Sequence, residues 1–135
     1  MIPLSLARTA IAAGGTLLAD GHGEDEVRAV TIDSRSITGG ELFVAIPGDR
    51  VDGHDYATQA LDAGATGVLI ENDERALATG ADPARLIRVP STQDGLGLLA
   101  KDSLARIRQI ASPLVVGVTG SVGKTTTKDL LASVL

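Results

Sequence analysis

A chain of 135 residues with a formal net charge of -5 has room for one ordinary domain, or for a small domain and the start of another. Cysteine is absent, which excludes a disulfide framework and a thiolate metal site. The acidic balance, with Phe43 and Tyr56 as the only aromatic residues, argues against a nucleic-acid partner, because single strands are gripped by aromatic stacking in a basic groove. The N-terminus lacks a signal-peptide pattern and no apolar run is long enough to span a membrane. We therefore expect a cytoplasmic protein without a membrane partner, and the sequence does not indicate its oligomeric state.

Short apolar runs alternate with turn signals over the first two thirds of the chain. Gly14-Gly15 closes a helix-like segment, Pro47-Gly48 ends a strand-like one, and Gly64 closes a second helix-like one. The pattern predicts helices at residues 4–13 and 56–63 and strands at residues 27–33, 42–46, 67–70 and 86–89. An aliphatic core of this kind is typical of an α/β protein.

A long amphipathic helix is predicted next. Ser91 offers an N-cap, and the apolar residues Leu99, Leu104 and Ile107 recur at helical spacing until Pro113. The continuous apolar run at residues 114–118 predicts a buried strand of a parallel sheet. We therefore expect three parts: a small mixed-sheet domain at residues 1–90, a connector helix at 91–113, and at 114–135 the truncated first strand and helix of an ATP-binding domain of the phosphate-loop type.

The segment after this strand has the composition of a phosphate-binding loop. Gly120 and Gly123 let the backbone fold around an anion, Lys124 can reach terminal phosphates, and the Thr125 hydroxyl can bind Mg²⁺. The general pattern places another glycine at position 118, where this chain has Val118. The alternative interpretation is a glycine-rich turn with a surface lysine. We expect an ATP site formed by Gly120, Ser121, Val122, Gly123, Lys124, Thr125 and Thr126, with Thr125 as the metal ligand and Lys124 as the catalytic residue.

Several segments resemble the Mur ligases, the amide-bond-forming enzymes of bacterial peptidoglycan synthesis. The resemblance covers nearly the whole chain and is carried by the run from Thr119 to Lys128, by Asp33-Ser34-Arg35, by residues 40–45 and by residues 48–56. It implies an ATP- and Mg²⁺-dependent ligase that serves cell wall biogenesis, cell shape and cell division. Ser121-Val122 and residues 52–56 favour the member that joins D-alanyl-D-alanine to UDP-N-acetylmuramoyl-tripeptide, rather than the member that adds the third amino acid. A non-catalytic phosphate-binding module is the other alternative.

The resemblance also implies a mechanism and a limit. ATP would phosphorylate the terminal carboxylate of the tripeptide, and the amine of D-alanyl-D-alanine would attack the acyl phosphate, with positioning and electrostatics doing most of the catalytic work. The chain stops at Leu135. We therefore expect an N-terminal fragment of a longer enzyme that is inactive alone.

The same resemblance implies that Ser34, Asp49, Arg50 and Val51 bind the UDP end of the substrate. Arg50 can pair with a diphosphate and Ser34 can hydrogen-bond a uracil edge. The alternative is that Asp33 caps an ordinary turn and that Arg50 is a solvated loop cation. His54 between carboxylates lacks the other ligands of a metal site, which favours a structural role, and His22 is expected to be exposed.

Overall fold

The protein is described by a computed structural model covering residues 3–119, with side chains to residue 108. Its centre is a five-stranded sheet in the order β2-β7-β6-β5-β4. The strands β4 (Ala29–Thr31), β5 (Glu41–Val44), β6 (Gly67–Ile70) and β7 (Leu86–Arg88) are parallel, and β2 (Thr16–Leu17) pairs antiparallel with β7. A second, antiparallel pair joins β1 (Leu4–Ser5) to β3 (Glu26–Val27).

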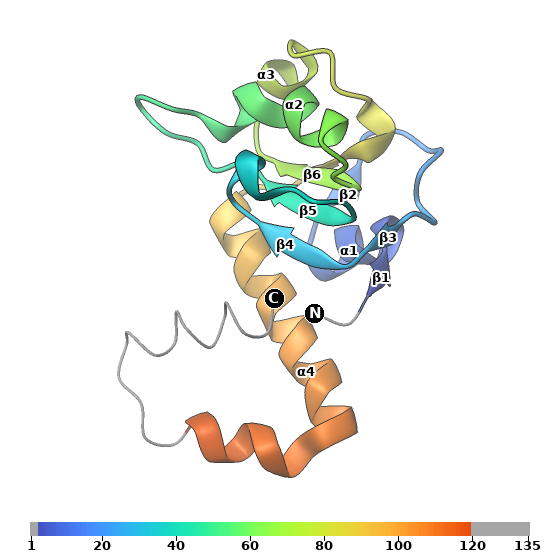
Figure 1. Cartoon of the computed structure of the whole chain (residues 1–135), viewed down its shortest axis with the longest axis vertical. Helices are drawn as coiled ribbons and strands as arrows, with labels where there is room; N and C mark the ends of the chain where they lie inside the picture. The colour runs from blue at the N-terminus through green and yellow to red at the C-terminus, as the bar shows by residue number, and fades with distance from the viewer. Residues whose placement is uncertain (1–2, 120–135) are drawn as a thin grey trace.

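Helices cover both faces of the sheet (Figure 1). On one face lie α1 (Leu6–Ala12) and α4 (Thr92–Thr119), and on the other α2 (Ala57–Asp62) and α3 (Asp73–Leu77). The alternation along β5 explains both layers, since Leu42 and Val44 pack toward α1 and Phe43 packs toward α2. Because both faces are covered, β5 and β6 are buried along their whole length.

Three short 3-10 turns share one sequence signal. Each of η1 (Ser34–Ser36), η2 (Gly53–Tyr56) and η3 (Pro83–Arg85) follows an aspartate whose carboxylate accepts a backbone N–H of the turn. These residues are Asp33, Asp52 and Asp82. A short carboxylate that bonds its own backbone two residues on is what makes aspartate favourable in such turns. The three turns therefore begin where the sequence places these aspartates.

The predicted strands and helices of residues 1–90 are present, and all except the strand at 67–70 have shifted ends. The predicted strand at 27–33 is divided between β3 and β4, and β1, β2 and α3 were not predicted. These three elements have two, two and five residues, too few for a hydrophobic period to stand out. A mixed α/β fold with a mostly parallel sheet is confirmed for residues 3–119.

The predicted strand at 114–118 is wrong in this structure, where α4 continues to Thr119. A strand needs a hydrogen-bonding neighbour, and none of the described strands pairs with this run. A helix satisfies its backbone groups internally and does not need a neighbour. Figure 1 shows that α4 changes direction in its second half, which contains Pro113, a residue that cannot donate a helical hydrogen bond.

Within the described residues, no helix is long and apolar enough to cross a membrane.

Candidate functional site

A pocket of about 660 Å³ lies beyond the carboxyl ends of β4 and β5. Parallel strands direct their following loops to the same edge of the sheet, where α/β proteins commonly bind ligands. The volume is in the range of small-molecule sites. The residues that line it come from the β4–η1 loop, from β5 and its following loop, and from η2 and α2: Ile32, Asp33, Ser34, Arg35, Phe43, Ile46, Pro47, Val51, Gly53, Tyr56 and Gln59.

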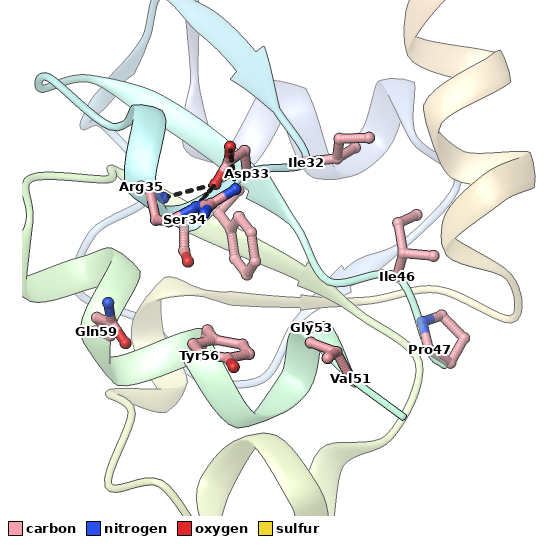
Figure 2. A pocket seen from close by; sticks show the side chains of 11 residues that line it. Ile32, Asp33, Ser34, Arg35, Ile46, Pro47, Val51, Gly53, Tyr56 and Gln59 are labelled. Atoms are coloured by element: carbon pink, nitrogen blue, oxygen red, sulfur yellow. Dashed lines mark hydrogen bonds and ion pairs between the residues drawn. The ribbon is translucent and has the colours of Figure 1, made fainter. Parts of the chain in front are cut away.

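One side of this pocket is apolar. Phe43 is buried at the end of β5, and Ile46 and Pro47 continue the same strand direction into the loop. Ile32 and Val51 are large apolar side chains that nevertheless remain 62% and 64% exposed. Figure 2 shows Ile46, Pro47 and Val51 grouped on one side of the pocket, with Ile32 nearby and Tyr56 beside Gly53. Exposed apolar side chains gathered around a hollow are typical of a ligand site.

The opposite side is polar and is built by η1. The Asp33 carboxylate accepts the Arg35 backbone N–H at 2.9 Å, the Arg35 Nε–H at 3.1 Å and an Nη2 hydrogen at 3.4 Å. The hydrogen bond from the Arg35 side chain, followed by the bond from its backbone, holds the pKa of Asp33 below its ordinary value, and the same pairing raises the pKa of Arg35. Both groups are therefore charged at neutral pH, with Ser34 between them in the sequence.

The structure brings two of the four predicted UDP-binding residues to this pocket. Ser34 and Val51 line it from separate loops. Asp49 and Arg50 lie in the same loop as Val51, but both are exposed and neither lines the pocket. Arg50 makes no ion pair with any residue between 3 and 108. The alternative interpretation of Asp33 also holds, because its carboxylate does cap the turn.

His54 has the structural role that the sequence favours. Its ring is buried, its Nδ1 lies 2.7 Å from Asp52 Oδ1, and its Nε2 accepts the backbone N–H groups of Glu71 and Asn72 at 2.9 and 3.1 Å. Because a backbone N–H can only donate, Nε2 is an acceptor and the ring proton is on Nδ1, where it donates to Asp52. The ring therefore fixes η2, beside the pocket, to the loop after β6.

A second contact fixes that loop to α4. The Glu71 carboxylate accepts the backbone N–H of Thr92 at 2.6 Å and its hydroxyl at 3.1 Å. Thr92 is the first residue of α4, whose unpaired N–H groups favour a carboxylate. Contacts through His54 and Glu71 thus connect the pocket loop with the start of α4.

His22 differs from the expectation of simple exposure. Its Nδ1 lies 2.9 Å from Asp25 Oδ2 and its Nε2 lies 3.4 Å from Asp82 Oδ2. The imidazole therefore joins the loop before β3 to the loop before β7. Across residues 3–108, no group of three or more His, Asp or Glu side chains could hold a metal ion.

Sequence reasoning missed the apolar lining of the pocket. Phe43, Ile46 and Pro47 are predicted as a strand and its end, and Tyr56 and Gln59 as parts of a helix, but none of them is predicted to bind a ligand. The available signal was the position of these residues directly after a parallel strand, beside Ser34 at the end of the neighbouring strand. The pairing of β4 with β5 could not be read from the sequence pattern.

Comparison with known proteins places the chain in a family. A family model described as "Mur ligase family, catalytic domain" matches residues 26–103, which is more than half of the chain and includes every residue that lines the pocket. The chain belongs to the Mur ligase family. The matched residues run from β3 into the first half of α4.

Individual Mur ligases match over most of the chain. It is 42% identical over 118 residues to the UDP-N-acetylmuramoyl-L-alanyl-D-glutamate--2,6-diaminopimelate ligase of Syntrophomonas wolfei, covering 87% of this chain and 23% of that protein. It is 37% identical over 158 aligned residues to the UDP-N-acetylmuramoyl-tripeptide--D-alanyl-D-alanine ligase of Mycobacterium leprae, covering all of this chain and 30% of that protein. The chain thus spans less than a third of the length of these two relatives.

A solved Mur ligase shares the fold. The crystal structure of MurF ligase from Thermotoga maritima, in complex with ADP, superposes with a TM-score of 0.50 and 32% sequence identity. The superposition covers 59% of this chain and 17% of that one. The ATP site predicted for this protein, Gly120–Thr126, lies outside the residues that the structure describes.

Proposed function

We propose that this chain is part of an ATP-dependent ligase of peptidoglycan precursor synthesis that joins D-alanyl-D-alanine to UDP-N-acetylmuramoyl-tripeptide. In this proposal residues 1–90 form the domain that binds the UDP end of the substrate, and residues 114–135 begin the ATP-binding domain. Residues 91–113 form the helix that connects the two. Family membership supports a ligase, and the relative from Mycobacterium leprae carries the name of this reaction.

The observation that carries the proposal is the pocket at the ends of β4 and β5. It combines an apolar wall formed by Phe43, Ile46 and Pro47 with the Ser34 hydroxyl and a charged turn. A uracil ring presents a flat face for the apolar wall and polar edges for the hydroxyl, and the pyrophosphate needs hydrogen-bond donors. Asp49 and Arg50 belong to the exposed loop that carries Val51, from which they can approach a bound ligand without lining the empty pocket.

The ATP site is proposed from the sequence. Gly120, Gly123 and Lys124 have the composition that cradles and neutralises phosphates, and Thr125 is the residue type that binds the accompanying Mg²⁺. The ADP complex of the Thermotoga maritima ligase supports a nucleotide as a ligand of this family.

The pocket is tested by titrating the 135-residue chain with UDP-N-acetylmuramoyl-tripeptide by isothermal titration calorimetry. Ser34→Ala and Val51→Asp should weaken binding, whereas Arg8→Ala, at a site on α1 away from the pocket, should not. Binding that is unchanged by both pocket substitutions would place the UDP site elsewhere.

A second candidate reaction has its own support. The relative from Syntrophomonas wolfei, at 42% identity, carries the name of the ligase that adds diaminopimelate as the third amino acid. The two reactions are separated by assaying the full-length protein that carries this chain with each substrate pair. We expect phosphate release with UDP-tripeptide and D-alanyl-D-alanine, and none with UDP-dipeptide and diaminopimelate.

A further inference from the structure

The charged residues lining the pocket are few. Of its described lining residues only Asp33 and Arg35 carry a charge, and Arg35 is the cation. The remaining lining residues are apolar or neutral. A ligand with an anionic group in this pocket would therefore meet one guanidinium within the lining.

The guanidinium is held in a defined position although it is exposed. The Arg35 side chain is 85% exposed, yet both oxygens of Asp33 receive hydrogen bonds from it, at 3.1 and 3.4 Å. These bonds use one hydrogen on Nε and one on Nη2. Of the five N–H groups of a guanidinium, three therefore remain for another acceptor. Figure 2 shows the two side chains paired with each other beside Ser34, and both residues belong to the lining of the pocket.

Fold stability does not account for this arrangement. An exposed ion pair contributes little to folding, because water screens it and two side chains lose freedom. A guanidinium that is already ordered, by contrast, loses less freedom when it binds a second anion. The arrangement is thus better suited to binding than to stability.

We infer that Arg35 is the residue that recognises the anionic part of the ligand, donating its free N–H groups to phosphate oxygens while the base lies against the apolar wall. Asp33 is a positioning residue that orients the guanidinium. The ligand class is a nucleoside diphosphate, which rests on the proposed UDP function. Arg50, which lies outside the lining, has at most a lesser part in this recognition.

The experiment compares UDP with uridine, which has the same base and sugar but no phosphate. Both are titrated into the 135-residue chain without divalent metal. The wild-type chain should bind UDP more tightly than uridine, and Arg35→Ala should weaken UDP binding roughly tenfold to hundredfold, the range for a charged hydrogen-bonding group. Uridine binding should be unchanged. Arg35→Lys keeps the positive charge but loses the planar guanidinium that can donate two parallel hydrogen bonds. It should therefore give an intermediate affinity for UDP.

One variant serves as a matched control, and a second compares Arg35 with the predicted binding residue Arg50. Arg28→Ala removes an exposed arginine that also pairs with a carboxylate but does not line the pocket, and it should bind UDP like the wild type. Arg50→Ala should retain most of the difference between UDP and uridine. Thermal melting of each variant verifies the fold, since Arg35 is too exposed for its loss to unfold the chain.

The outcomes separate the inference from the proposed function. If Arg35→Ala binds UDP like the wild type, or if Arg50→Ala alone abolishes the preference for UDP, the assignment of Arg35 is wrong while the UDP pocket stands. If the wild-type chain binds neither UDP nor uridine, the proposed function fails and this inference fails with it.

Discussion

His54 shows how one buried polar side chain can hold several loops. Each ring nitrogen has a partner, so the cost of burying the imidazole is offset by three hydrogen bonds. Two of those bonds satisfy backbone N–H groups at Glu71 and Asn72 that a substitution would leave without an acceptor. The stability of the pocket loop therefore depends on a residue that does not itself line the pocket.

Replacing His54 with alanine should lower the free energy of unfolding by about 2–4 kcal/mol, because it leaves two backbone donors without partners and opens a cavity. Urea denaturation followed by circular dichroism measures the change. His22→Ala is the control, since that imidazole is about a third exposed and water can replace its bonds. Equal losses in the two variants would contradict the structural role assigned to His54.

Asp52 should make the folded state sensitive to acid. Burial alone would raise the pKa of Asp52, but hydrogen bonds from the His54 backbone and ring outweigh it and lower the pKa below the ordinary 3.8. The unfolded chain then binds more protons than the folded chain near that pH. The stabilisation is complete above the ordinary pKa and is lost as the pH falls through the lower pKa of the folded state.

Urea unfolding at a series of pH values, from neutral down to about pH 3, measures this dependence. In Asp52→Asn the loss of stability on acidification should be smaller than in the wild type, because the titrating group is absent. Asp62→Asn, at an exposed position of α2, provides the comparison. An unaltered pH profile in Asp52→Asn would mean that other carboxylates carry the effect.

At the scale of elements, α4 has two glycines in very different surroundings. A Cβ added at Gly97 would have no heavy atom within 4 Å, whereas one at Gly95 would lie 3.1 Å from Leu69 Cδ2 and 3.5 Å from the Ala13 carbonyl oxygen. Gly95 thus lets α4 approach β6 and the end of α1 closely. Gly97 lowers the helix propensity without any packing reason among the described residues.

Gly97→Ala should therefore stabilise the chain by about 0.5–1 kcal/mol, the difference in helix propensity between the two residues. Gly95→Ala should gain less or lose stability, because the Leu69 side chain must move. The two variants are compared by thermal melting. If Gly95→Ala stabilised the chain more than Gly97→Ala does, α4 would not pack as closely on β6 as described here.

The elements that the sequence predicted well are the ones with a local cause. The run at residues 67–70 forms β6 without any shift, since three buried apolar side chains between Gly67 and a polar loop favour a strand. The run at residues 114–118 has the same appearance but is helical here, because the outcome for such a run depends on neighbouring strands. The pattern of apolar residues shows that a segment will be buried, but it does not show which neighbouring strand or helix the segment packs against.

The candidate site could be predicted only in part for the same reason. The family resemblance implies a binding role for Ser34 and Val51, which line the same pocket, but it implies none for Phe43 and Tyr56, which line it too. Their meeting depends on the register that places Thr31 beside Phe43 in the parallel pair of β4 and β5. That register is a long-range property, which no local pattern in a single sequence reveals.

At the scale of the whole molecule, the parallel sheet sets the direction of the ligand site. The ends of β4 and β5 carry the pocket, the loop after β6 carries Glu71, and Glu71 binds the first residue of α4. The carboxyl ends of β4 and β5 and the start of α4 therefore lie toward one edge of the sheet (Figure 1).

The phosphate-loop proposal predicts a defect in catalysis rather than in folding. In the full-length protein that carries this chain, Lys124→Ala should lower turnover roughly 10²-fold or more, because the ammonium group stabilises negative charge that develops on the transferring phosphoryl group. Phosphate release with Mg-ATP, UDP-tripeptide and D-alanyl-D-alanine measures the rate. Binding of UDP to the pocket at β4 and β5 should be unchanged, since the residues that line that pocket lie between positions 32 and 59. Lys101→Ala, an exposed lysine of α4, should retain the wild-type rate. A Lys124→Ala enzyme with nearly normal turnover would show that the glycine-rich segment is an ordinary turn and that the ATP phosphates bind elsewhere.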